Sequence, residues 1–139
     1  MPLKNDVEKS WVGWLVDDLG GREQEYRDVL LALLEDRRIP KAKIQAGTTN
    51  MWWRRDSLYI DVTSTMDGQI TTTIHVQEYG SSLFVGRAAE TRRQWNYYKR
   101  MAALAFLTTV DRCIDDSFVG LVELSAVHRL EERERPDHS

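Results

Sequence analysis

Three observations on the amino-acid sequence predict an α+β protein built around one buried helix. The stretch 101–107 (MAALAFL) has no polar side chain on any face, which is typical of a helix covered on most sides. Residues 58–79 alternate between apolar and polar side chains, as strands with one buried face do. Segments with helical periodicity precede and follow these strands rather than separating them, which favours α+β over a wound parallel sheet.

Two helices are predicted ahead of the strands. Apolar residues of about 6–18 recur at the i, i+4, i+7 and i+8 positions of one helical face. They are Val7, Trp11, Trp14 and Leu15. A second helix is expected from about Arg22 to Arg38, where the apolar spacing is regular and Pro40 follows. Since only a short Gly-Gly link separates the two, the sequence predicts an N-terminal helical hairpin.

An antiparallel meander of three or four strands is predicted next. Residues 43–46 are expected to form a short edge strand and 51–53 the first substantial strand, with a turn at 54–57. The strands 58–65 and 70–79 follow, and then 83–88. The order of the segment 43–53 within the sheet stays open.

The apolar pattern also predicts the register of the meander. A three-residue loop at 66–68 pairs Ile60 with Ile74, whereas a two-residue loop would set apolar against polar side chains. A two-residue loop at 80–81 then pairs Val76 with Val85. One face of the meander is apolar and is expected to meet the helices. The other face is rich in threonine and is expected to contact water; its residues are Tyr59, Asp61, Thr63, Thr71, Thr73, His75, Gln77 and Phe84.

The central helix is predicted to contain 95–114 and to begin within the basic-aromatic segment 91–100, with a break at 115–117 and a shorter, weaker helix from Phe118 to Val127 after it. Residues 1–130 are expected to form a single domain, and the charged residues 131–139 a frayed tail. Met101–Leu107 is much shorter than the about 20 apolar residues of a membrane span, so no membrane association is expected.

Composition narrows the possible functions. The 139 residues carry a formal net charge of −3, which argues against a generally cationic nucleic-acid binder. Cys113 is the single cysteine, so neither an intrachain disulfide nor a cysteine-based metal cluster is expected. The N-terminus lacks the apolar region of a signal peptide, and a cytoplasmic location is therefore predicted.

Basic and aromatic residues gather in two segments of an otherwise mildly acidic chain. Such residues bind phosphates and stack on bases, but they are also the usual hot spots of protein interfaces. Ordinary packing of the aromatic rings, with the arginines in water, is the third interpretation. Arg92 and Arg93, expected in the first turn of the central helix, would oppose its macrodipole unless an anion offsets them. The candidate interface or ligand-binding residues are Trp52, Trp53, Arg54, Arg55, Arg92, Arg93, Trp95, Tyr97 and Arg100.

Catalytic and metal-binding signals are weak. His75, with Tyr59 and Asp61 as predicted neighbours on the polar sheet face, is a candidate proton-transfer group. An ordinary solvated sheet face explains the same pattern. No nucleotide-binding, hydrolase or metal-ligand spacing occurs in the sequence, so no cofactor and no metal are expected.

The sequence therefore favours a small non-enzymatic protein-interaction module, adaptor-like, chaperone-like or regulatory, that forms a homodimer. The alternatives are nucleic-acid or phosphate-ligand binding through the basic-aromatic residues, and an enzyme that uses the polar sheet face. The predicted order of helices around a meander is similar in layout to small secretion-chaperone-like and other dimeric α+β modules, without a shared motif.

Overall fold

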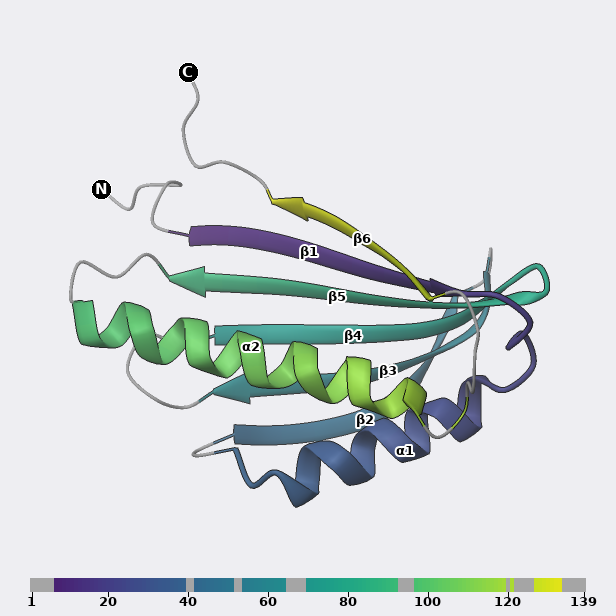
Figure 1. Cartoon of the computed structure of the whole chain (residues 1–139), viewed down its shortest axis with the longest axis horizontal. Coiled ribbons are helices and arrows are strands. Elements are labelled where there is room, and N and C mark those ends of the chain that lie inside the picture. Colours follow the sequence, from purple (N-terminus) through teal and green to yellow (C-terminus); the bar gives the residue numbers. More distant parts are fainter. Residues whose placement is uncertain are drawn as a thin grey trace.

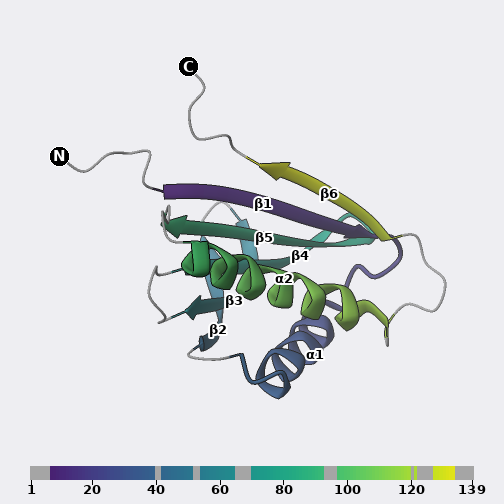
Figure 2. The same ribbon diagram turned by 60° about the vertical axis from the view of Figure 1, so that its left-hand side comes forward.

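A computed structural model describes residues 7–39, 42–51, 54–64, 70–92, 97–119, 121 and 127–133. The chain forms two layers, a six-stranded antiparallel sheet and two helices that lie against the same face of it (Figures 1 and 2). The predicted α+β class and antiparallel sheet are confirmed. The predicted number of strands is wrong, and so is the N-terminal helical hairpin.

The chain places its first strand in the interior of the sheet. In sequence order the elements are β1 (Val7–Val16), α1 (Glu23–Asp36), β2 (Ala42–Met51), β3 (Arg54–Ser64), β4 (Ile70–Tyr79), β5 (Ser82–Arg92), α2 (Tyr97–Val119) and β6 (Val127–Arg133). The spatial order is β2-β3-β4-β5-β1-β6, with every neighbouring pair antiparallel. Strand β1 thus lies between β5 and β6, both of which come much later in the chain (Figure 1).

Residues 7–16 form a strand where a helix was predicted. Val12, Trp14 and Val16 alternate toward the helices and are buried, while Trp11 lies on the opposite face. The helical spacing was misleading because both faces of this strand carry large apolar side chains. Without this helix there is no helical hairpin, and the layout that resembled the secretion-chaperone-like modules is absent.

The predicted pairing of the meander is confirmed. Ile60 faces Ile74 across β3 and β4, and Val76 faces Val85 across β4 and β5. The two-residue turn at Gly80–Ser81 is also confirmed, with a φ of 64° at Gly80 that favours glycine. The predicted loop at 66–68 lies outside the described residues.

The segment 42–57 contains more strand than predicted. Strand β2 spans ten residues, not the four of the expected short edge strand, and it lies at one edge of the sheet beside β3. The turn predicted at 54–57 is wrong, because these residues begin β3. Met51 ends β2, and Trp52 and Trp53 lie outside the described residues.

Helix α1 is the helix predicted at 22–38, and it packs on the sheet and on the second half of α2 (Figure 2). Its buried face is formed by Tyr26, Leu30 and Leu34. The Tyr26 ring packs on Phe118 with ring centroids 4.6 Å apart, and its hydroxyl donates to the Ile114 carbonyl at 3.0 Å. Burial raises the pKa of the Tyr26 hydroxyl well above its ordinary value.

Helix α2 continues through the residues predicted to interrupt it. Asp115 accepts a 2.7 Å hydrogen bond from Trp14 Nε1, and Asp116 pairs with Arg37 at 2.6 Å. The Ser117 hydroxyl donates to the Cys113 carbonyl within the helix. These polar side chains therefore bond to groups of neighbouring elements or of the helix itself, and they do not end the helix.

The prediction of a separate C-terminal helix from Phe118 to Val127 is wrong. Phe118 and Val119 are the last residues of α2, and Val127 is the first residue of β6. The beginning of the predicted frayed tail, residues 131–133, belongs to β6 and pairs with β1. Residues 134–139 lie outside the described residues.

A buried ion pair joins α2 to the middle of the sheet. Arg87 of β5 points toward the helices and is 3% exposed. Its Nε and Nη2 donate to the two carboxylate oxygens of Asp111 at 2.7 and 2.8 Å, and its Nη1 donates to the Ser10 hydroxyl at 2.8 Å. All three guanidinium nitrogens are thus hydrogen-bonded, which a buried charge requires.

Candidate functional site

The sheet face opposite the helices, here called the open face, has a row of positions unusually rich in glycine. The strand pairing places one residue of each strand in this row, which crosses the sheet from edge to edge. The row is Gly47, Tyr59, His75, Gly86, Gly13 and Leu130. Since a glycine has no side chain, rings from neighbouring positions can lie directly on the backbone there.

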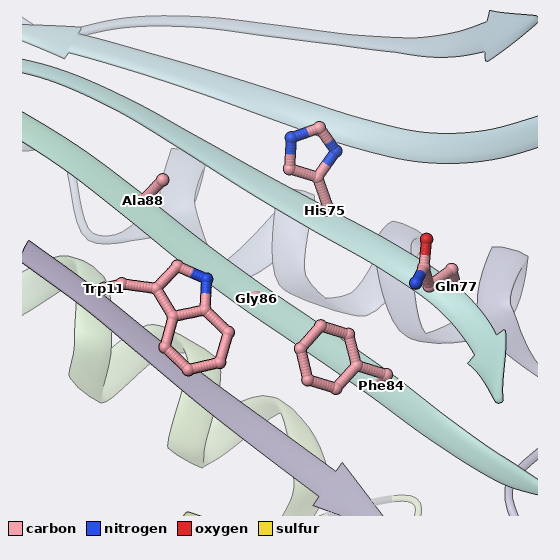
Figure 3. A pocket seen from close by; sticks show the side chains of 6 residues that line it. All are labelled: Trp11, His75, Gln77, Phe84, Gly86 and Ala88. Carbon is pink, nitrogen blue, oxygen red and sulfur yellow. The ribbon is translucent and has the colours of Figure 1, made fainter. Parts of the chain in front are cut away.

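Trp11 of β1 and Phe84 of β5 occupy this space on the open face. A Cβ atom on Gly13 would lie 2.7 Å from Trp11 Cη2, and one on Gly86 would lie 3.1 Å from Phe84 Cε2. The two ring centroids are 6.1 Å apart and the ring planes differ by 24°. The rings therefore lie nearly flat on the sheet, side by side, and present their faces rather than their edges to the outside (Figure 3).

A shallow hollow of about 150 Å³ lies beside this aromatic pair. Strand β4 contributes two polar side chains to its lining, His75 and Gln77, which stand beside the rings in Figure 3. The complete lining is Trp11, His75, Gln77, Phe84, Gly86 and Ala88. None of these residues is a lysine, arginine, aspartate or glutamate, so the hollow combines apolar surface with an imidazole and an amide.

The predicted polar-face candidates Tyr59, Asp61 and His75 all lie on the open face. Tyr59 is opposite His75, as predicted, and Asp61 is opposite Thr73 one pair further along. The Tyr59 hydroxyl, however, lies against Gly47 of β2, where a Cβ atom would be only 2.6 Å away. It therefore leans away from the strand that carries His75.

The outer side of α2 carries a second surface feature, an apolar stripe on its first half. Tyr97, Met101 and Leu104 recur at i, i+4 and i+7, and their exposed fractions are 68%, 47% and 53%. Ala105 and the 80% exposed Tyr98 flank them. The expectation that the segment 101–107 is covered on most sides is thus met only on its sheet side, where Ala103 and Phe106 are buried.

The basic-aromatic residues are divided between the two ends of the sheet. Arg54 and Arg55 begin β3, whereas Arg92 ends β5, and the pairing of both strands with β4 puts these positions at opposite ends. Tyr97 and Arg100 lie in the exposed first turn of α2, which has no acidic residue. Trp52, Trp53, Arg93 and Trp95 lie outside the described residues. Arg92 belongs to β5, so the macrodipole argument made for it does not apply.

Sequence reasoning missed the aromatic pair because residues 6–18 were read as a helix. That reading put Trp11 and Trp14 on one face, but the strand turns them to opposite faces. The signal was present as an alternation of Val12, Trp14 and Val16 with Trp11 and Gly13. The predicted position of Phe84 on the polar sheet face is correct, but the sequence pattern did not reveal that Trp11 lies beside it.

Neither Cys113 nor a metal site provides a candidate for catalysis among the described residues. Cys113 is fully buried on the inner side of α2, and this burial raises the pKa of its thiol. A buried thiol with a raised pKa is a poor nucleophile. Across the described ranges, no cluster of three or more His, Cys, Asp or Glu residues is arranged to hold a metal ion.

The helices in the described ranges are also too short or too polar to cross a membrane. Comparison with known protein families and with curated protein sequences found no match.

Proposed function

We propose that the protein is a non-enzymatic interaction module that forms a homodimer through the apolar stripe of α2 (Tyr97, Met101, Leu104 and Ala105). The exposure of this stripe is the observation that carries the proposal. Of the six large apolar side chains exposed among the described residues, four lie on the first two turns of α2. Contiguous exposed apolar surface of this kind usually marks an interface.

The position of α2 leaves the stripe accessible. Helix α1 packs against the second half of α2, where Cys113 and Ile114 are buried, so the first half has only the sheet beneath it (Figures 1 and 2). The stripe therefore resembles one half of a helix-helix interface. A partner helix would bury it without any change in the fold.

A second copy of the chain suits this stripe. Two α2 helices packed about a two-fold axis perpendicular to them would run antiparallel, with Leu104 of one copy against Met101 of the other. The small side chain of Ala105 allows the helices to approach closely. The antiparallel arrangement also keeps the cationic first turns, with Lys99 and Arg100, at opposite ends of the interface. Because this short stripe buries less surface than a standard interface, we expect a dissociation constant on the order of 10–100 μM.

Sedimentation equilibrium over a wide concentration series tests the proposal. The wild-type chain should shift from one to two chains per particle as the concentration rises. Leu104→Glu should remain monomeric, because burying a carboxylate in so small an apolar interface costs more free energy than the interface supplies. Tyr79→Ser is the matched control, because it removes an exposed large side chain at the β4–β5 turn, at the opposite end of β5 from the start of α2, and should dimerise like the wild type. A wild type that stays monomeric at about 1 mM, or a Leu104→Glu variant that still dimerises, would contradict the proposal.

Among the residues whose side chains the structure describes, the nucleic-acid alternative is supported by the first turn of α2, where Tyr97, Tyr98, Lys99 and Arg100 are exposed. It predicts that a short single-stranded oligonucleotide binds at low salt and is released as salt rises. Lys99→Gln with Arg100→Gln should then abolish binding without changing the dimer. Binding that ignores salt, or no binding at low salt, rules this alternative out.

A further inference from the structure

We propose that the open face binds an uncharged sugar ring of a saccharide on the aromatic pair Trp11 and Phe84. This site lies on the opposite side of the sheet from α2, so it is independent of the proposed dimer. Its parts are the flat ring pair, the hollow beside the pair and the polar side chains of β4 (Figure 3).

The geometry of the rings selects the kind of ligand. Their exposed faces carry the negative part of the ring quadrupole, which attracts the weakly positive C–H hydrogens of a sugar ring laid flat upon them. The two rings together form a surface broad enough for a flat ligand because Gly13 and Gly86 let both settle on the backbone. The hollow of about 150 Å³ is of the size that holds a single six-membered ring.

The polar groups around the rings match a sugar's hydroxyl groups. The Gln77 amide both donates and accepts hydrogen bonds, and the Trp11 indole N–H is a further donor. A sugar hydroxyl is likewise both donor and acceptor, so it can satisfy either kind of group. Small-molecule sites typically combine apolar surface with a few such orienting groups.

Charge disfavours a phosphate-bearing ligand on this face. The lining contains no lysine or arginine. The next lysine on the open face, Lys9 of β1, stands opposite Glu90 of β5, so the two charges offset each other. Nucleic-acid binding depends on cationic contacts with phosphates, and the residues that line the hollow provide none of them.

NMR titration of the full-length chain with cellotetraose, maltotetraose and adenosine tests the inference. The two tetrasaccharides present neutral sugar rings in different linkages. Adenosine represents the alternative class of ligand, uncharged planar heterocycles. We expect at least one tetrasaccharide to shift the Trp11 indole N–H and the backbone amides of residues 75–77 and 84–86. The Trp11 indole signal is assigned by its loss in Trp11→Phe.

Substitutions on the exposed side of β4 separate binding from folding. Gln77→Ala should weaken the tetrasaccharide's affinity by about fivefold, the usual effect of losing one neutral hydrogen bond. Thr71→Ala, at the far end of the same strand face and exposed, should bind like the wild type. Both variants should keep the wild-type amide spectrum away from the substituted position.

Three results would overturn the inference. The first is that neither tetrasaccharide shifts the Trp11 and β4 signals, which would leave the aromatic pair as a packing device of the sheet. The second is that adenosine alone shifts them, which would assign the surface to planar heterocycles. Equal affinities of Gln77→Ala and Thr71→Ala would show that the hollow beside the rings takes no part in binding.

Discussion

At the scale of single residues, the ion pair of the buried Arg87 guanidinium is expected to matter most for stability. Removing its partner by Asp111→Ala leaves an uncompensated charge under α2, and this should lower the free energy of unfolding by about 3–5 kcal/mol. The double variant Arg87→Met with Asp111→Leu removes both charges and should recover most of this loss. Urea denaturation of the three proteins measures the difference, and a double variant no more stable than Asp111→Ala would contradict this account.

The Tyr26 hydroxyl makes stability depend on pH in the alkaline range. Its pKa in the folded state is raised above the ordinary 10.0, so the folded chain keeps a proton that the unfolded chain releases. This contribution is fully present below about pH 10 and is lost as the pH rises toward the folded pKa, by up to about 1.4 kcal/mol per pH unit. Cys113 acts in the same direction from its ordinary pKa of 9.0.

Denaturation at several pH values between 8 and 11 tests this dependence against Tyr26→Phe. The variant should lose about 1 kcal/mol at neutral pH, because the hydrogen bond to the Ile114 carbonyl disappears. Its stability should then fall less steeply above pH 10 than that of the wild type. Parallel curves for the two proteins would show that Tyr26 titrates similarly in the folded and unfolded states.

At the scale of elements, the last turn of α2 is attached to its surroundings by two adjacent carboxylates of unequal importance. Asp115 holds the indole N–H of the fully buried Trp14, so Asp115→Ala orphans a buried donor and should cost about 1–3 kcal/mol. Asp116 pairs with Arg37 at the surface, with about half of its side chain exposed, and Asp116→Ala should cost less than about 1 kcal/mol. Equal losses of unfolding free energy would contradict this ranking.

The same two aspartates show why some elements could not be predicted from sequence. Asp115-Asp116-Ser117 was read as a helix end because these residues often compete with helical hydrogen bonds. Their partners, Trp14 and Arg37, come from elements about 80 to 100 positions earlier, and no local pattern reveals them. The meander was predictable because register depends on apolar alternation within adjacent segments.

The candidate surfaces likewise contain residues that local sequence predicts and contacts that it does not. Tyr97 could be proposed from composition alone, and Phe84 could be assigned to the correct sheet face from its alternation. The pairing of Phe84 with Trp11 depends on β1 entering the sheet beside β5, which brings together residues more than 70 positions apart. The local spacing of apolar residues does not indicate which distant strand β1 pairs with.

At the scale of the whole molecule, the sheet order brings the two ends of the described chain together. Ser10 of β1 lies opposite Arg133 of β6, so a short peptide can join the C-terminus to the N-terminus. A circular permutant with new termini within residues 65–69 keeps every described strand and helix intact. We expect it to fold, with the amide spectrum of the wild type outside the altered ends. A permutant that fails to fold would show that the chain needs its original ends.

The interior position of β1 also has a consequence for the order of events during synthesis. This strand is made before the other strands of the sheet, yet its two neighbours are residues 82–92 and 127–133, so it has no pairing partner until β5 has been made. Contacts between such distant segments slow folding, because a long loop must close before they contribute. A ribosome-bound chain therefore exposes a tryptophan-rich strand while α1 and strands β2 to β4 have already been made, and it is during this interval that the chain is most exposed to aggregation.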